Sequence, residues 1–384
     1  MEASINRKVK DIEISGIRKF FNMVADKSDI LSLTIGQPDF PTPEHVKAKT
    51  KEAIDHNKTT YTHNAGILPL RQAISSFVKK RYQLEYNANE EVIVTAGASQ
   101  AIDVCLRTIV ENGDEVILPG PVYPGYEPLV KLAGGVPRYV DTRATQFKMT
   151  AEAIENAITD KTKAIIIPYP SNPTGVTLTE KELGDIAAVI KKHQLFMIAD
   201  EIYSELVYET SHFSIGRFEE IRDQVIIING VSKSHSMTGY RIGYILAADW
   251  LCKHMLKVHQ YNVSCASSIS QYGALEAIQN GMNDPVEMKK TYQKRRDYVY
   301  HRLKSMNLAS YKPEGGFYYF IDIRHLGSTS FEVALRLVEE AKVALVPGSA
   351  FSEYGEGYLR LSYAYDMDTL EEGLNRIERI ITRQ

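Results

Sequence analysis

The sequence predicts an α/β protein in which a larger domain is built on a doubly wound, mostly parallel sheet of about seven strands and a smaller domain is α+β. Between about residues 90 and 250, seven short runs rich in β-branched residues alternate with helical stretches. These runs are apolar from end to end, which is typical of strands that helices cover on both faces. After about residue 285 the pattern changes to a charged helical stretch and a few strand-like runs, which indicates a second unit.

The expected strands of the larger domain lie within residues 91–97, 114–120, 136–142, 163–169, 195–201, 224–230 and 240–247. In the smaller domain we expect helices within 288–306 and 331–342, and strands within 315–323 and 358–364. The first segment of the chain has too little apolar pattern to fold alone, so it should pack on the smaller domain or lie across the cleft. The larger domain is therefore expected to span 38–285, and the smaller one 1–37 and 286–384.

The composition of the 384 residues, 44% hydrophobic and 24% charged, is ordinary for a soluble globular protein and excludes global disorder. With 45 Lys and Arg against 48 Asp and Glu, the formal net charge is −3. Such a chain has no basic field for nucleic acid or for an anionic membrane. We therefore expect small-molecule substrates, with neither nucleic acid nor membrane as a partner, and we predict no metal site.

The three cysteines, Cys105, Cys252 and Cys265, have no C-x-x-C spacing and cannot all pair. They are expected to be buried thiols in a reducing compartment. The N-terminal segment carries charges throughout and lacks the apolar run of a signal peptide, and no run of about 18 apolar residues predicts a membrane span. These observations predict a cytoplasmic protein.

Polar motifs follow four of the seven expected strands: AGASQ at 96–100, SNPTG at 171–175, DEIY at 200–203 and NGVSKSHSMTGYRIG at 229–243. In open α/β sheets, ligands bind outside the carboxyl ends of the strands. The first two motifs also have ordinary structural interpretations. Ser99 could hold a phosphate or only cap a helix, and Asn172 could point into a site or only mark a turn.

The other candidates carry charge. Asp200 closes an apolar run, where a carboxylate needs a partner or caps a helix. Most lysines are solvated surface groups, but small residues and hydroxyls surround Lys233, and Arg241 follows eight positions later. His235 is expected to be a spacer without a role in proton transfer. Arg360, in an apolar strand, could pair with a structural carboxylate or bind a ligand carboxylate through its bidentate fork.

Together these motifs resemble those of the fold-type I pyridoxal phosphate-dependent enzymes, and among them the class I/II aminotransferases. The resemblance covers nearly the whole chain. Its most specific element is residues 230–243, which fit the family's pattern of a small residue, the lysine, a spacer, an arginine and a glycine. One departure is Gly230, because many relatives place a serine three positions before the lysine. Ser232 would then carry more of the phosphate binding.

The resemblance implies a role for each candidate residue. Lys233 would bond covalently to the aldehyde of pyridoxal phosphate, and Asp200 would pair with the pyridinium nitrogen. Asn172 and Tyr203 would hydrogen-bond the 3′-oxygen, while Tyr123 would stack on the ring. Four further positions would hold the phosphate: Ala98, Ser99, Ser232 and Arg241.

The resemblance also implies a homodimer with shared active sites, in which Tyr61 reaches a phosphate across the interface. Arg360 would clamp the substrate α-carboxylate, helped by Asn172 and the backbone near Gly36. A protonated pyridine ring stabilises the carbanion formed when an amino acid loses its α-proton, and a carboxylate beside the ring nitrogen keeps that proton on. The amine of Lys233 could then move a proton as general base and acid.

These roles imply a ping-pong aminotransferase that exchanges an amino group between an L-amino acid and a 2-oxo acid. The subgroup that the sequence most resembles acts on aspartate, aromatic amino acids or N-acetyl-L,L-diaminopimelate, an intermediate of lysine biosynthesis, with 2-oxoglutarate as the expected acceptor. A carbon–sulfur β-lyase of the same fold would use much of the same apparatus. A non-enzymatic regulator would need a DNA-binding module, for which the chain has no spare length.

Overall fold

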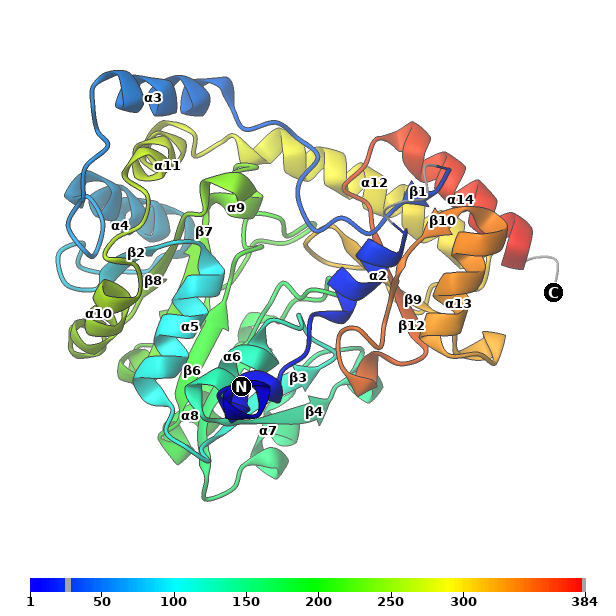
Figure 1. Ribbon diagram of the computed structural model, residues 1–384, viewed down its shortest axis with the longest axis horizontal. Coiled ribbons are helices and arrows are strands. Elements are labelled where there is room, and N and C mark those ends of the chain that lie inside the picture. The colour runs from blue at the N-terminus through cyan, green and yellow to red at the C-terminus, as the bar shows by residue number, and fades with distance from the viewer. Residues whose placement is uncertain (25–28, 382–384) are drawn as a thin grey trace.

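The computed structural model describes residues 1–24 and 29–381. Its larger part contains a seven-stranded sheet, and its smaller part is built from the elements between residues 285 and 381 (Figure 1). The sheet has the order β2-β8-β7-β6-β5-β3-β4. β8 runs antiparallel to both of its neighbours, β2 and β7, and the other neighbouring strands pair in parallel. The seven strands are β2 (Val92–Thr95), β3 (Glu115–Gly120), β4 (Val136–Asp141), β5 (Thr162–Ile167), β6 (Phe196–Asp200), β7 (Val225–Gly230) and β8 (Gly243–Leu246).

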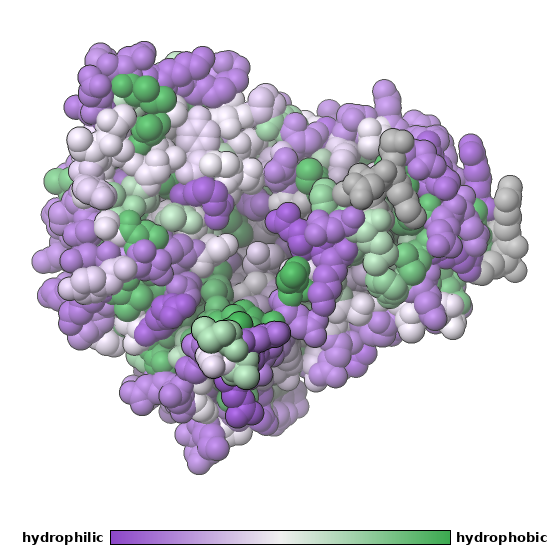
Figure 2. Space-filling view, viewed as in Figure 1, coloured by the Kyte–Doolittle hydropathy of each residue, from purple (hydrophilic) through white to green (hydrophobic). Residues whose placement is uncertain are grey.

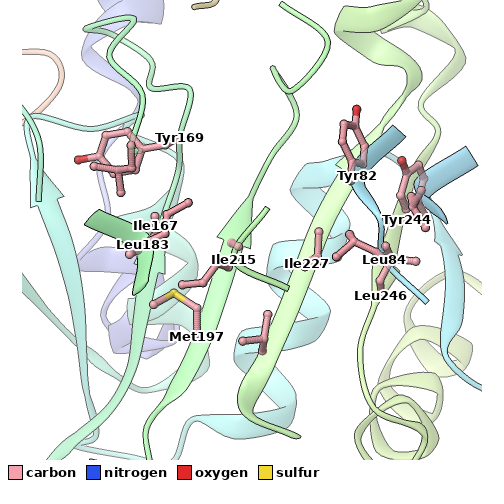
Figure 3. Packing of buried hydrophobic residues seen from close by; sticks show 14 of the residues in the cluster. Tyr82, Leu84, Ile167, Tyr169, Leu183, Met197, Ile215, Ile227, Tyr244 and Leu246 are labelled. Carbon is pink, nitrogen blue, oxygen red and sulfur yellow. The ribbon is translucent and has the colours of Figure 1, made fainter. Parts of the chain in front are cut away.

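Helices cover both faces of this sheet, because neighbouring residues of each strand point to opposite sides. On β7, for example, Ile226 and Ile228 belong to one apolar cluster and Val225 and Ile227 to another. The first cluster includes residues of α5 (Ala98–Ile109), α6 (Tyr126–Ala133) and α10 (Asp249–Val263). The second includes residues of α4 (Leu68–Tyr82), α7 (Ala151–Ala157), α8 (Glu180–His193) and α11 (Ser268–Asn280). Figure 3 shows part of this second cluster around Ile227 and Met197.

The smaller part packs three helices against a three-stranded antiparallel sheet of order β11-β12-β9. The strands are β9 (Tyr318–Asp322), β11 (Val346–Pro347) and β12 (Tyr358–Ser362). The helices are α12 (Pro285–Ser305), α13 (Ser330–Arg336) and α14 (Met367–Ile381). A third apolar cluster, which includes Val299, Leu361 and Leu374, fills the space between them. In register, Arg360 of β12 lies opposite Phe320 of β9.

The N-terminal segment touches both parts of the molecule. It contains α1 (Arg7–Lys10), α2 (Gly16–Val24) and β1 (Leu31–Ser32), and β1 pairs in parallel with β10 (Val343–Ala344) of the smaller part. Near the other end of the segment, the Lys8 amine donates a 2.9 Å hydrogen bond to the side chain of Asn112 in the larger part. In Figure 1 the segment runs from α6 to the smaller part. The domain limits at 37/38 and 285/286 stay predictions.

The predicted fold class is confirmed: six of the seven expected runs contain one strand of the mostly parallel sheet, and β5 begins one residue before the seventh, at Thr162. Cys105 and Cys252 are buried, but Cys265 is only half-buried, so the expectation of three buried thiols is wrong for that residue. It lies just after α10, where the chain turns towards α11. None of the helices formed by residues 1–24 and 29–381 combines the length and the apolar character that a membrane span requires. The cytoplasmic location stays a prediction.

Candidate active site

The four polar motifs meet where the carboxyl ends of β5, β6 and β7 face β12 of the smaller part. Hydrogen bonds join the two sides: the Lys233 amine donates to the Gly36 carbonyl, and the Arg360 guanidinium donates to the side chain of Asn172. In Figure 2 the surface is mostly hydrophilic and is hollowed between the larger part at the left and the smaller part at the right. An open groove of about 490 Å³ begins at Gln37, the residue after Gly36, and its lining also includes Ser236.

Lys233 lies in the short helix α9 (Val231–Ser234), directly after β7. Its Nζ atom is 2.6 Å from the carbonyl oxygen of Gly36. The same atom lies 5.9 Å from the ring centroid of Tyr203 and 5.8 Å from that of Phe317. Burial and the positive charges of two nearby guanidinium groups lower the pKa of the Lys233 amine to about 8. Near neutral pH, an amine with this pKa is partly unprotonated and can act as a nucleophile or base.

Asp200 ends β6, and its carboxyl group is held at both oxygens. Oδ2 accepts a 2.8 Å hydrogen bond from the Tyr126 hydroxyl, and Oδ1 accepts one of 3.2 Å from the backbone N–H of Ile202. Burial raises the pKa of Asp200 to about 6, although the Tyr126 hydrogen bond opposes the rise. The group does not cap a helix, because Ile202 belongs to a turn. At pH 7 this carboxyl is mostly ionised and can hold a cationic N–H group.

Arg360 is 2% exposed and lies in the middle of β12. Nη1 donates to Asn172 Oδ1 at 3.0 Å and Nη2 donates to the Thr34 carbonyl at 2.7 Å, whereas Nε has no hydrogen-bond partner. Its guanidinium carbon lies 4.4 Å from the ring centroid of Tyr318. No salt bridge joins Arg360 to a carboxylate of the described residues. A buried cation without a carboxylate partner favours recognition of a ligand carboxylate over a purely structural ion pair.

A cationic side chain lies where α5 begins. The first residue of this helix is Ala98, and Ser99 is exposed at the second position, so Ser99 is not the N-cap residue. The N-cap is Gly97, with a φ of 83°, and a Cβ atom there would lie 2.4 Å from a terminal nitrogen of Arg241. A guanidinium group thus packs against the positive end of a 12-residue helix, a combination that suits a phosphate. Ser232 is buried in α9, which follows the carboxyl end of β7.

The glycine at position 230 has a steric cause. Gly230 pairs with Gly243 across β7 and β8. A Cβ atom at Gly230 would lie 2.7 Å from the Ile242 carbonyl oxygen and 2.9 Å from the Gly243 Cα atom. The close pairing of these strands therefore leaves no room for a serine side chain at position 230.

Of three further residues named from the sequence, Tyr61 and His235 make little contact with this cluster in a single chain, whereas Tyr123 lies near enough for the charges of Asp200, Arg241 and Arg360 to act on its pKa. Tyr61 is 88% exposed. Tyr123 is 36% exposed, and its ring packs edge-on at 5.6 Å against that of Tyr126. His235 is buried and bonded to Ser234 and to the Gly281 carbonyl. These contacts account for His235 as a packing residue.

Two tyrosines of the site were not predicted. Tyr126 holds Asp200, and Tyr318 lies 3.0 Å from the Tyr203 hydroxyl while its ring packs on Arg360. Tyr126 stands three positions after Tyr123 in the same loop-and-helix segment. This closeness in sequence to a candidate residue was the signal that could have pointed to Tyr126. Tyr318 sits in a strand of consecutive aromatic residues, which the sequence alone cannot distinguish from a core strand.

Residues 28–377 match the family described as aminotransferase class I and II. The chain belongs to the class I and II aminotransferases. It is 58% identical over 384 residues, 100% of this chain and 97% of the relative, to a probable N-acetyl-LL-diaminopimelate aminotransferase of Bacillus subtilis (strain 168). The family assignment made from the sequence motifs is thereby confirmed.

Solved structures of aminotransferases show the same fold. An aromatic aminotransferase from Pyrococcus horikoshii OT3 has a TM-score of 0.90 and 40% identity, with 96% of this chain and 99% of that chain covered. A double mutant of Thermus thermophilus aspartate aminotransferase has a TM-score of 0.93 and 34% identity, with 98% and 99% covered. Members of this family use pyridoxal phosphate, and the protein is a pyridoxal phosphate-dependent aminotransferase.

The residues present fit this cofactor. The buried, ionisable Asp200 suits a pyridinium nitrogen, and the amine of Lys233, with its pKa lowered to about 8, suits an aldehyde. The close approach of Arg241 to Gly97 at the start of α5 provides the cationic cradle that a phosphate requires.

Proposed function

We propose that this aminotransferase moves the amino group of N-acetyl-L,L-diaminopimelate to 2-oxoglutarate by a ping-pong mechanism. One observation carries the assignment of its active site. The Lys233 amine lies close enough to the Asp200 carboxyl group and the Arg360 guanidinium for both charges to act on its pKa. Hydrogen bonds from Lys233 to Gly36 and from Arg360 to Asn172 join the larger and smaller parts around these groups. These groups are the ones required to hold an amino acid by its carboxylate beside a base and an ionised carboxylate.

Lys233 would form the covalent link to pyridoxal phosphate, and its amine would move the proton once the amino group of the substrate has replaced it in that link. When bound, the cofactor supplies an electron sink for the carbanion formed at the substrate α-carbon. Because the pKa of the Lys233 amine is lowered to about 8, its Nζ atom can take up that proton near neutral pH and release it again. Its hydrogen bond to the Gly36 carbonyl holds the amine next to the backbone that is assigned to the substrate carboxylate.

Asp200 holds the proton on the ring nitrogen. Tyr126 and the Ile202 amide fix the two carboxyl oxygens, so the carboxylate loses little freedom when it meets the ring. The hydroxyl of Tyr203 and the amide nitrogen of Asn172 are assigned to the 3′-oxygen. The Asn172 side-chain oxygen already accepts a bond from a guanidinium, which turns its NH₂ group towards other partners.

Binding of the two anionic groups is divided between separate cations. Arg360 is assigned to the substrate α-carboxylate, with the Gly36 backbone beside it, because its Nε atom lacks a partner in a buried site. Arg241, with Ser232 and the start of α5 at Ala98 and Ser99, is assigned to the cofactor phosphate. Tyr123, in the loop beside Tyr126, is assigned to the ring face.

The choice of donor is supported by similarity and by space. The full-length relative at 58% identity bears the name of an N-acetyl-LL-diaminopimelate aminotransferase. We assign the acylated end of the donor to the open groove of about 490 Å³, because its lining includes Gln37 and Ser236, which follow Gly36 and Lys233 within three positions. Aspartate and aromatic donors form the second candidate class, because similar structures carry those names at 34% and 40% identity.

A half-reaction screen tests the donor. The holoenzyme is mixed with N-acetyl-L,L-diaminopimelate, L-aspartate, L-phenylalanine or L-tyrosine, and loss of the cofactor's visible absorption band is followed by stopped flow. We expect the acylated donor to give a second-order rate constant at least about tenfold above the others, the discrimination that roughly 1.4 kcal/mol provides. A higher constant for aspartate or an aromatic donor would overturn the assignment.

Two controls separate this function from its alternatives. Pyruvate release from cystathionine that exceeds amino-group exchange would instead identify a carbon–sulfur β-lyase. With 2-oxoglutarate varied at several donor concentrations, a ping-pong mechanism gives parallel double-reciprocal lines, and intersecting lines would exclude it.

We further propose a two-fold homodimer in which Tyr61 of each copy reaches the phosphate bound by the other. The 88% exposure of this large aromatic side chain supports a partner surface there. Lys233→Ala and Tyr61→Ala proteins are each expected to have low activity. In a mixed dimer, one site holds both defects and the other holds neither, so subunit exchange should restore activity. Activities that only add, or a monomer in sedimentation, would contradict the shared site.

A further inference from the structure

Tyr318 connects groups on the two sides of the cleft. It is the first residue of β9, is 1% exposed, and comes from the smaller part of the molecule. Its hydroxyl is 3.0 Å from that of Tyr203, which follows β6 in the larger part. Its ring lies under Arg360, whose guanidinium carbon is 4.4 Å from the ring centroid. A Cβ atom at Gly36 would lie 3.1 Å from the Tyr318 hydroxyl, so the glycine lets the chain pass close to it.

The direction of the hydrogen bond between the two phenols follows from counting protons. Each tyrosine hydroxyl has one proton to donate. If Tyr203 donates its proton to the cofactor's 3′-oxygen, as the proposed function assigns, the bond between the tyrosines can form only when Tyr318 donates to the Tyr203 oxygen. A donor that itself accepts a hydrogen bond becomes a stronger donor, especially in a buried site of low dielectric constant. Tyr318 would therefore strengthen the bond from Tyr203 to the cofactor.

The ring of Tyr318 has a separate effect, on Arg360. The side chain of Asn172 and the Thr34 carbonyl hold two nitrogens of the guanidinium at its edge. Of the two rings beside the guanidinium carbon, that of Tyr318 is nearer, at 4.4 Å, and that of Phe351 lies at 5.0 Å. A cation over an aromatic face is attracted to it, and more strongly when both are desolvated. Edge and face contacts together fix the plane in which Arg360 can meet a carboxylate.

We propose that Tyr318 is a positioning residue with two separable actions: its hydroxyl strengthens the Tyr203 hydrogen bond to the cofactor, and its ring orients Arg360 towards the substrate carboxylate. This inference rests on the roles that the proposed function gives to Tyr203 and Arg360. It predicts that deleting the hydroxyl changes the cofactor's electronic properties, whereas deleting the ring also weakens substrate binding.

Two variants separate the actions. Tyr318→Phe keeps the ring and loses the hydroxyl, and Tyr318→Leu loses both. The first readout is the pH midpoint of the visible absorption band of the bound cofactor. A weaker hydrogen bond to the 3′-oxygen leaves more electron density for the nitrogen that Lys233 contributes, so that nitrogen keeps its proton to higher pH. We expect Tyr318→Phe to raise the midpoint, by less than Tyr203→Phe does, and to leave KM for the donor within about twofold.

Tyr318→Leu should raise the midpoint equally and also raise KM about tenfold or more, because the face contact with Arg360 is lost. The control is Tyr319→Phe: Tyr319 is the next residue of β9, is equally buried, and donates its hydroxyl to the Tyr311 carbonyl. This variant should leave both midpoint and KM unchanged. Thermal melting of every variant shows that it is folded before the readouts are compared.

A double-variant cycle tests the connection directly. In a Tyr203→Phe background, Tyr318→Phe should cause no further midpoint shift, because the hydroxyl through which it acts is absent. An unchanged midpoint in the single variant, or two shifts that simply add, would overturn the inference. Failure of the proposed function is recognised separately: the wild-type holoenzyme would then transfer no amino group from any donor of the panel.

Discussion

Replacing Arg360 by lysine keeps the positive charge but removes the planar pair of donors. In the structure, Nη1 and Nη2 bond to Asn172 and to the Thr34 carbonyl at 3.0 and 2.7 Å, and the guanidinium face lies on an aromatic ring. A single ammonium nitrogen cannot satisfy both acceptors and also present two parallel N–H groups to a carboxylate. The variant Arg360→Lys should therefore be impaired mainly in its interaction with substrate.

The size of the loss follows from the kind of contact. Truncating one partner of a buried, hydrogen-bonded charge pair costs about 2 to 5 kcal/mol. This range corresponds to a loss of about 30-fold to several thousand-fold in kcat/KM. One acceptor at the Arg360 site also loses its donor, which should reduce the free energy of unfolding by about 1 to 3 kcal/mol. Cofactor affinity should change little, because the phosphate is assigned to Arg241.

The assay measures kcat/KM per bound cofactor, together with the visible absorption band and thermal melting. Arg324→Lys is the matched control, since Arg324 is an arginine of the smaller part whose side chain is 61% exposed and paired with Asp322. It should leave kcat/KM unchanged. If Arg360→Lys keeps kcat/KM within about threefold of wild type, or sheds cofactor while its activity per bound cofactor stays intact, Arg360 is structural and the reasoning fails.

Three further predictions concern pH and packing. In cofactor-free protein, the rate of pyridoxal phosphate capture should rise with pH to a midpoint near 8, because burial and nearby guanidinium groups lower the pKa of Lys233 to about 8; stopped-flow absorbance giving a midpoint above 10 would contradict this. Burial opposes the charge of His45, but hydrogen bonds to Asp284 and Glu276 raise its pKa above the ordinary value. The protonated His45 side chain therefore stabilises the folded protein fully below about pH 6.5, and this contribution is lost as pH rises through the folded-state pKa. His45→Gln should lower the free energy of unfolding at pH 5.5 by less than about 1 kcal/mol, given its partial exposure, and by less still at pH 9; equal losses in urea unfolding at both pH values would refute the argument. Gly230→Ser should lower that free energy by about 1 to 3 kcal/mol, since its Cβ atom would meet a backbone oxygen at 2.7 Å, and unchanged thermal melting would show that the strands can separate there.

The strands of the larger domain could be predicted from local pattern alone. Residues 163–169 and 224–230 are apolar throughout, and such runs are stable only when both faces are covered. In the structure, alternate residues of β5 and β7 belong to two apolar clusters on opposite sides of the sheet, as that pattern predicts. What the pattern could not provide was the order of the strands, or the antiparallel position of β8 between β2 and β7. Pairing between strands depends on contacts between distant residues, which local periodicity does not encode.

The same division applies to the candidate site. Lys233, Asp200 and Asn172 could be recognised from the sequence because each lies at or after the carboxyl end of a strand, and these ends reach one edge of the sheet. Tyr318 and Tyr126 could not, since their function comes from partners more than 70 positions away in the chain. The residue types and their pattern along the sequence therefore determined which side chains can react and which fold the chain adopts. Tertiary structure decided which hydroxyl holds the Asp200 carboxyl group, which ring supports Arg360 and why position 230 must be glycine, because hydrogen bonds, ring contacts and steric limits arise only when distant segments pack together.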